Sequence, residues 1–155
     1  MAIARALVKL LRVLLLDEPL SNLDARLRLQ TREEIRHIQR QTCVTTLFVT
    51  HDQEEAMSIS DRIVVMKEGV LQQIGAPQQV YDDPANLFVA KFLGTPPINV
   101  FDGQIQNGML CLGGEAVLPV PGLTDQSVTV GIRPEGFLPQ ADGPLSCTLN
   151  SVEVM

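Results

Sequence analysis

The sequence LLLDEP at residues 14–19 decides how this chain folds. It lies within a continuous apolar run, RVLLLD at residues 12–17, which ends in acid and is typical of a strand buried on both faces of a sheet. Pro19 ends the strand, because proline lacks the amide hydrogen that a sheet requires. The pattern therefore predicts two carboxylates, Asp17 and Glu18, at the carboxyl end of a strand, where open α/β sheets bind ligands.

A helix and a second strand follow. In residues 24–41, single apolar side chains alternate with groups of charged ones, and this pattern predicts a helix with one modest buried stripe. The stripe consists of Leu27, Ile35 and Ile38. Residues 45–50 (TTLFVT) are β-branched and apolar and predict a second buried strand. A strand, a helix and a strand at this spacing indicate a parallel βαβ unit.

Shorter elements continue the first part of the chain. Asp52, with Glu55 three positions later, is a variant of the capping box that starts a helix. Residues 62–66 and 70–74 then predict a hairpin with Gly69 in the left-handed position of its turn. The last elements of this part are two short helices, around residues 78–81 and 86–93, separated by Pro84.

Glycine and proline divide the chain. No glycine occurs before Gly69, whereas residues 94–155 contain nine of the eleven glycines and seven of the ten prolines. The first part should therefore consist of long regular elements, and the last part of short strands joined by turns. We expect the domain boundary at GTPP, residues 94–97, which gives domains at residues 1–94 and 95–155.

The composition is that of a globular protein. Of the 155 residues, 45% are hydrophobic and 19% are charged, which permits a packed core and argues against intrinsic disorder. No apolar run approaches the roughly 18 residues of a membrane-spanning helix, and residues 1–10 lack the cleavage site of a signal peptide. Three distant cysteines fit reduced thiols in the cytosol rather than a disulfide framework or a zinc site; they are Cys43, Cys111 and Cys147.

The charge distribution disfavours binding to nucleic acid. The net charge is −6, although residues 1–40 hold eight of the twelve basic residues and only five of the eighteen acidic ones. A basic helix in an acidic protein is typical of a solvated face. Beyond Lys91, Arg133 is the single basic residue, so the late strands lack the cations and aromatic rings that single-stranded nucleic acid requires.

The acidic pair after the first strand has two interpretations. One carboxylate can hold a hydrated Mg²⁺ ion while the next orients a water for attack on phosphorus. Alternatively, Asp17 and Glu18 serve as the N-terminal cap of the next helix. His51 directly follows the second strand, and its ring can donate a hydrogen bond to a phosphate oxygen. A lone histidine at such a position can equally be structural.

Several motifs together resemble the second half of the nucleotide-binding domain of an ABC transporter ATPase. LLLDEP resembles the Walker B strand, SNLD at residues 21–24 the D-loop, and VTHDQEEAM at residues 49–57 the H-loop of the sugar-importer branch. IARAL at residues 3–7 resembles the helix after the signature motif, and residues 61–103 also read as that branch. GIRPE at residues 131–135 resembles the start of the OB-like regulatory region called TOBE.

The resemblance implies a fold and a set of partners. Residues 1–94 would be an α/β domain, the C-terminal half of the parallel sheet of a P-loop NTPase. Residues 95–155 would be an incomplete all-β, OB-like segment, because the family's appended domain continues further. The family binds ATP and Mg²⁺, pairs with membrane-embedded permease subunits, and forms a homodimer or a heterodimer with another ABC ATPase subunit. It would lie in the cytoplasm, peripheral on the inner face of the cell membrane.

The resemblance also implies roles for individual residues. Asp17 would support Mg²⁺ through its hydration shell, and Glu18 would be the general base or water-positioning group. His51 would contact the γ-phosphate and help to stabilise transition-state charge. The residues of the D-loop motif would pass between the two subunits of the nucleotide-bound dimer; they are Ser21, Asn22 and Asp24. The alternative for Ser21 and Asn22 is an ordinary polar turn.

These 155 residues lack the phosphate-binding part of such a site. A P-loop requires the pattern G-x-x-x-x-G-K-[ST], because its backbone amides must curl around the phosphates. The first glycine is Gly69, so no such loop precedes LLLDEP, and the LSGGQ signature is also missing. We therefore expect a truncated chain that does not bind or hydrolyse ATP alone, and whose uncovered sheet makes it marginally folded or self-associating. The alternatives are a noncatalytic docking or regulatory module and the inert product of a disrupted gene.

Overall fold

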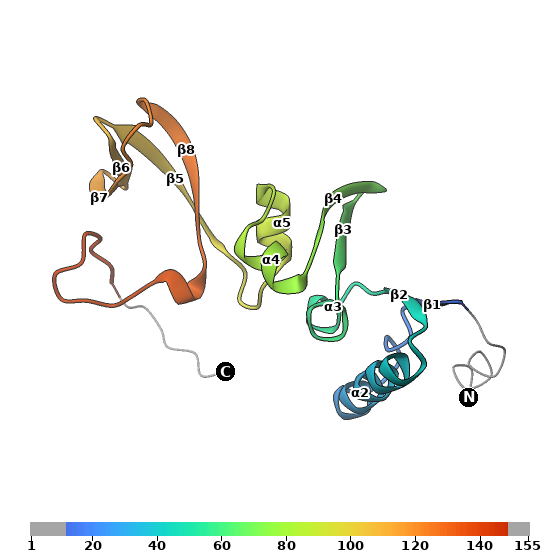
Figure 1. The fold of residues 1–155 in the computed structure, drawn as a ribbon. Helices are drawn as coiled ribbons and strands as arrows, with labels where there is room; N and C mark the ends of the chain where they lie inside the picture. Colours follow the sequence, from blue (N-terminus) through green and yellow to red (C-terminus); the bar gives the residue numbers. More distant parts are fainter. Residues whose placement is uncertain (1–11, 149–155) are drawn as a thin grey trace. The chain divides into compact units, whose positions relative to one another are not determined.

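The computed structural model describes residues 12–148, which form two compact units (Figure 1). One unit ends at Leu93 and the other begins at Gly94, beside the GTPP sequence. The IARAL motif at residues 3–7 lies outside the described residues. Within residues 12–148, no helix is long and apolar enough to cross a membrane.

The first unit begins with a parallel βαβ arrangement. Strand β1 (Val13–Asp17) and strand β2 (Thr45–Val49) pair in parallel, and helix α2 (Ala25–Thr42) connects them, as the sequence predicts. Buried Leu14 of β1 and buried Ile35 of α2 line the same small hollow, so the helix packs against this face of the sheet. A parallel pair brings the carboxyl ends of both strands to one edge.

The opposite face of this sheet is uncovered, as expected for these 155 residues, although the apolar run itself is typical of a strand buried on both faces. Leu15 is 69% exposed and Leu47, its register partner, is 54% exposed. Val13 and Val49 are also half exposed on the same face. Among residues 12–148, β1 and β2 form a two-stranded sheet with no further strand. The apolar sequence of these strands thus has more hydrophobic surface than one helix covers.

A hairpin follows helix α3 (Gln53–Ile59). Strands β3 (Ile63–Lys67) and β4 (Val70–Gly75) pair in antiparallel fashion, with Lys67 opposite Val70. The two turn residues both adopt positive φ, 50° at Glu68 and 79° at Gly69. The predicted hairpin and its left-handed glycine are confirmed. Two adjacent residues of positive φ give the turn that matches the twist of a hairpin.

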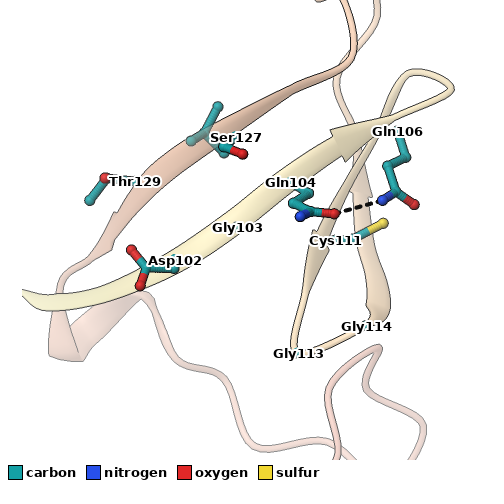
Figure 2. A pocket seen from close by; sticks show the side chains of 10 residues that line it. Asp102, Gly103, Gln104, Gln106, Cys111, Gly113, Gly114, Ser127 and Thr129 are labelled. Carbon is teal, nitrogen blue, oxygen red and sulfur yellow. Dashed lines mark hydrogen bonds between the residues drawn. The ribbon is translucent and has the colours of Figure 1, made fainter.

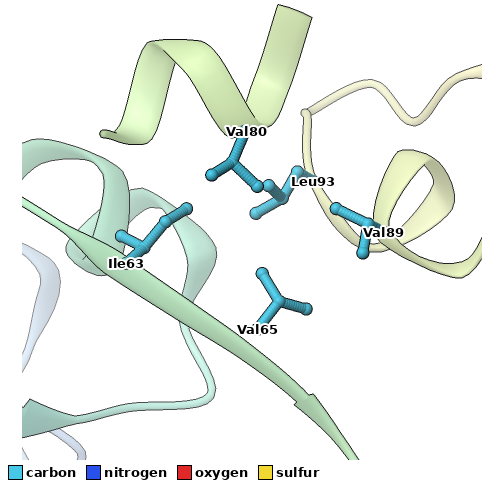
Figure 3. Packing of buried hydrophobic residues seen from close by; sticks show 5 residues of the cluster. All are labelled: Ile63, Val65, Val80, Val89 and Leu93. Atoms are coloured by element: carbon cyan, nitrogen blue, oxygen red, sulfur yellow. The ribbon is translucent and has the colours of Figure 1, made fainter. Parts of the chain in front are cut away.

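Two short helices cover one face of this hairpin. They are α4 (Pro77–Asp82) and α5 (Leu87–Phe92), close to the predicted ranges. A cluster of five buried side chains joins them to β3 (Figure 3): Ile63, Val65, Val80, Val89 and Leu93. Partly buried residues of α3 pack against the cluster, so the hairpin and three helices share one core.

The second unit is a four-stranded antiparallel sheet. Its strands are β5 (Asn99–Gln106), β6 (Met109–Leu112), β7 (Glu115–Pro119) and β8 (Gln126–Ile132), in the order β7-β6-β5-β8, followed by the 3-10 turn η1 (Pro134–Gly136). Two-residue turns at Asn107-Gly108 and Gly113-Gly114, all of positive φ, join the first three strands. Short strands joined by turns, as the glycine and proline content predicts, are confirmed for residues 99–132.

Candidate functional site

The end of β1 brings Glu18 and His51 into contact. The amide of Glu18 donates to the carbonyl of Val49 at 2.9 Å, which extends the β1–β2 pairing by one residue. Glu18 has a φ of 42°, so the chain turns at this residue. Its Oε1 lies 2.9 Å from Nδ1 of His51. The two side chains that the motifs predict to act on a phosphate therefore meet at the carboxyl edge of the sheet.

The contact changes the acid–base properties of His51. The hydrogen bond that His51 donates to Glu18, together with the negative charge of Glu18, raises the pKa of the His51 imidazole, and Asp52 and Glu55 add smaller contributions in the same direction. The ring is 74% exposed and the Glu18 side chain 47% exposed, so both can reach a ligand. Because Nδ1 faces Glu18, Nε2 is the ring nitrogen that remains for that ligand.

Asp17 is the exposed last residue of β1. Within residues 12–148, no group of three or more acidic, histidine or cysteine side chains is arranged to hold a metal ion. A single carboxylate nevertheless fits Mg²⁺ that arrives on a nucleotide, because this ion keeps most of its waters and takes one or two carboxylates plus phosphate oxygens. Asp17 thus suits a water-mediated contact and not a closed protein cage.

The acidic pair does not cap the next helix, so that alternative interpretation is wrong. Asp24 is the N-cap of α2, and its Oδ1 accepts a hydrogen bond from the amide of Leu27 at 3.0 Å. Residues 19–22 form a turn in which the Ser21 hydroxyl donates to the carbonyl of Glu18 at 2.9 Å. Asn22 is exposed in this turn. Ser21 therefore lies beside the Glu18–His51 pair, while the carboxylate of Asp24 holds the start of α2.

The residues that flank His51 are anchored on both sides. Asp52 caps α3, as predicted, with Oδ1 accepting from the amides of Glu54 and Glu55 at 2.9 and 3.1 Å. In a capping box the Glu55 side chain would accept directly from the Asp52 amide. Here the Thr50 hydroxyl links the two groups, because it accepts from the Asp52 amide at 3.0 Å and donates to Glu55 at 2.7 Å. Thr50 is a site residue that the sequence reasoning missed.

A second missed residue is Arg28 of α2. Its guanidinium lies 3.4 Å from Oδ2 of Asp52 and 3.6 Å from Oε1 of Glu55. Glu55 is only 4% exposed and is the buried charged residue of the described chain. An arginine on the buried side of a mostly charged helix is the signal that would have indicated an ion pair, because burial of one charge requires an opposite one.

The second unit holds a separate polar hollow of about 600 Å³ (Figure 2). It lies over β5, β6 and β8, and its side chains include Asp102, Gln104, Ser127 and Thr129. Along β5, the side-chain amide of Gln106 donates to the side-chain oxygen of Gln104 at 2.7 Å. The lining contains amides, hydroxyls and one carboxylate but no basic or aromatic side chain, so it offers no stacking platform for a nucleobase.

Comparison with known proteins identifies relatives for nearly the whole chain. The sn-glycerol-3-phosphate import ATP-binding protein of Jannaschia sp. is 45% identical over 154 residues, which are 98% of this chain. The trehalose/maltose import ATP-binding protein of Thermococcus litoralis is 49% identical over 144 residues, 86% of the chain. The diacetylchitobiose uptake system ATP-binding protein of Streptomyces coelicolor is 48% identical over 88% of the chain.

A family model adds independent support for the second unit. Residues 99–137, which include all four strands β5 to β8, match the CysA C-terminal regulatory domain. The chain covers 44%, 39% and 38% of the lengths of the three relatives, so it spans less than half of each. The chain is a homologue of the ATP-binding subunits of ABC importers of the sugar and glycerol-phosphate branch, and corresponds to a part of such a subunit.

Proposed function

We propose that this chain carries the water-activating part of an ATP-hydrolysis site in the energy subunit of a carbohydrate-type importer. The 155 residues alone neither bind nor hydrolyse ATP. The observation that carries the proposal is the 2.9 Å contact between Glu18 and His51 at the carboxyl edge of β1 and β2. Phosphoryl transfer depends on positioning and charge stabilisation, and these two side chains supply both for the attacking water.

Glu18 and His51 have different tasks in this scheme. Oε1 of Glu18 is taken by His51, so Oε2 remains to orient the attacking water and accept its proton. His51 donates to Glu18 through Nδ1, and Nε2 can donate to the γ-phosphate only when the ring is protonated. The raised pKa of His51 favours that protonated form. The positive ring then stabilises the negative charge that the phosphate oxygens carry in the transition state.

Asp17 would hold Mg²⁺ through the hydration shell of the ion. The bound ion would neutralise charge on the nucleotide phosphates. Asp17 lies one residue before Glu18 and is exposed, so it can take part in a water-mediated contact while Glu18 faces the water to be activated. Ser21, Asn22 and Asp24 lie in or beside the turn after β1, and we assign them to the surface that meets a second ATPase subunit.

The remaining parts of the site must come from elsewhere. These residues contain no P-loop sequence to hold the phosphates in place. Partners of the proposed complex are a second ABC ATPase subunit and membrane-embedded permease subunits, at the cytoplasmic face of the membrane. The names of the relatives point to sugars, oligosaccharides or glycerol phosphate as the class of imported solute.

A second candidate function is a noncatalytic docking module. The exposed apolar face of β1 and β2, with Leu15 and Leu47, favours it, because a patch of this kind is typical of a surface that a partner covers. A docking module binds its partner equally well without nucleotide. A half-site completed by the partner binds Mg-ATP only in the mixture.

Calorimetry of Mg-ATP binding tests both candidates. The purified chain alone should give no heat of binding, and its mixture with a full-length sn-glycerol-3-phosphate import ATP-binding protein should give nucleotide binding above that of the full-length protein alone. Glu18→Gln should preserve the binding in the mixture and abolish its added hydrolysis, because the amide cannot accept the proton. Micromolar binding of Mg-ATP by the chain alone would refute the proposed half-site.

A further inference from the structure

Arg28 contacts both chain segments that carry the site residues. Its Nη2 donates to the carbonyl of Leu23, in the segment between β1 and α2, at 3.3 Å. Its Nη1 donates to Oδ2 of Asp52, which directly follows His51, at 3.4 Å. Its Nε lies 3.6 Å from Oε1 of Glu55 in the same helix. We infer that Arg28 is a positioning residue, which joins these two segments so that His51 faces Glu18.

The contact between Arg28 and Glu55 is buried on the Glu55 side. The Glu55 side chain is 5% exposed, and Nε of Arg28 is buried without a hydrogen-bond partner at normal distance. The Glu55 carboxylate receives a hydrogen bond from Thr50 at 2.7 Å, and Arg28 provides the opposite charge. Because an unpaired buried charge is strongly unfavourable, the Glu55 carboxylate requires the opposite charge that the partly exposed Arg28 side chain provides.

The contacts close a ring around the Glu18–His51 pair. On one side, the Ser21 hydroxyl donates to the carbonyl of Glu18, and two residues later the carbonyl of Leu23 accepts from Arg28. From Arg28, the bond to Asp52 leads back to His51, its neighbour in sequence, and His51 contacts Glu18. The separation of Glu18 and His51 is therefore determined through β1–β2 pairing on one side and through Arg28 on the other.

Replacement of Arg28 has two effects that would shift the pKa of His51 in opposite directions. Removal of its positive charge leaves Asp52 and Glu55 unneutralised, and both raise the pKa of His51 further if the geometry is kept. Loss of positioning separates His51 from Glu18 and removes the largest cause of the raised pKa, so the pKa of His51 falls. A lysine keeps the charge but has a single ammonium group, which cannot donate to both the Leu23 carbonyl and Asp52 in the fork geometry of arginine and also remain beside Glu55.

The inference rests on the proposed function, and NMR titration of the two histidines of the 155-residue chain tests it. In Arg28→Lys and Arg28→Met we expect the pKa of His51 to fall toward its ordinary value of about 6.5. The amide signals of residues 22–24 and 51–52 should shift together. Arg26→Lys, an exposed arginine on the same helix turn, is the matched control and should change neither. His37 of α2 serves as the internal reference.

The outcomes separate this inference from the proposed site. A pKa of His51 that is unchanged in Arg28→Lys, or that rises in Arg28→Met, overturns the positioning role while the Glu18–His51 pair stands. A wild-type His51 with an ordinary pKa that does not respond to Glu18→Gln overturns the pair and the positioning role together. Should Arg28→Met fail to fold, as its His37 signal would reveal, the charge-conserving Arg28→Lys decides the question.

Discussion

Oε1 of Glu18 and Nδ1 of His51 lie 2.9 Å apart although 33 residues of sequence separate them. The parallel pairing of β1 and β2 explains the proximity, because Asp17 is in register with Val49 and each site residue follows shortly after its strand. The bond from the Glu18 amide to Val49 then fixes the position of the turn. The proximity of the pair is thus a consequence of the βαβ connection, and the turn at Glu18 sets the final contact.

The Glu18–His51 pair should make stability depend on pH. The pKa of His51 is raised in the folded chain, so the pair stabilises the fold fully below the unfolded-state pKa of about 6.5. This stabilisation is lost as pH rises through the folded-state pKa of His51. Denaturant unfolding of the wild-type chain and of Glu18→Gln between pH 5 and pH 8 measures the difference.

We expect the difference in the free energy of unfolding between the two chains to be largest near pH 5 to 6 and to shrink toward pH 8. His37→Gln is the control, because this exposed histidine of α2 lies far along the helix from the site. A difference between wild type and Glu18→Gln that stays constant across this pH range would show that the two side chains do not pair in solution.

Much of the fold follows from local patterns in the sequence. The βαβ unit, the Asp52 cap and the hairpin at Glu68-Gly69 appear in the structure as predicted, because each depends on neighbouring residues or on a fixed period. The proximity of Glu18 and His51 follows from the same reasoning, since parallel strands end at one edge. The hydrogen-bond distance between the two side chains depends on the turn at Glu18, and the residue types in this turn do not predict its positive φ.

Two features could be predicted from sequence patterns only in part. The contacts of Arg28 with Asp52 and Glu55 join residues 24 and 27 positions apart, so the helix pattern can place Arg28 on the buried side of α2 but does not show which acidic residues it meets. The uncovered sheet was expected, but a continuous apolar run indicates how much surface a strand can bury, and not which of its faces is covered. Tertiary packing decides both features.

The exposed sheet face should cause self-association. Leu15 and Leu47 are register partners on this face, 69% and 54% exposed. The double substitution Leu15→Lys and Leu47→Glu replaces them by an opposite-charge pair that cross-strand neighbours tolerate. In sedimentation velocity, we expect the wild-type chain to show mass above 17.0 kDa that grows with concentration, and the double variant to remain at the monomer mass.

The covered face of the same strand provides the control for that experiment. Leu14→Ala should leave the association unchanged, because Leu14 is 9% exposed and faces α2, but it should lower the free energy of unfolding by about 2–4 kcal/mol. A wild-type chain that is monomeric at all concentrations would contradict the prediction of self-association.

The turn of the β3–β4 hairpin should be open to stabilisation. Glu68 adopts a φ of 50°, a conformation that costs an ordinary side chain energy and that asparagine tolerates. The β5–β6 hairpin uses Asn107 at the corresponding position, with a φ of 51°. Glu68→Asn should raise the free energy of unfolding by about 0.5–1 kcal/mol, measured by urea denaturation.

Substitution of Gly69, the next residue of this turn, should destabilise the hairpin. It has a φ of 79°, and no atom lies within 4 Å of the position that a Cβ would take. Gly69→Ala should therefore cost about 1 kcal/mol from backbone conformation alone, without a steric clash. Equal stability of wild type, Glu68→Asn and Gly69→Ala would be incompatible with this turn geometry.

The core around β3 should be the most sensitive part of the first unit to side-chain truncation. Leu93 is 2% exposed and packs with Val80, Val89 and two residues of β3. Leu93→Ala removes buried methyl groups and leaves a cavity that the short helices α4 and α5 cannot fill, so the free energy of unfolding should fall by about 2–4 kcal/mol. Leu87→Ala, in the same helix segment but 42% exposed, should cost well under half as much. The five buried side chains of this core come from residues 63–93 and not from the edge that carries Glu18 and His51, so the pKa of His51 in NMR titration should be the same in Leu93→Ala as in wild type wherever the variant is folded. A fall in that pKa would mean that the hairpin core and the β1–β2 edge are one coupled unit.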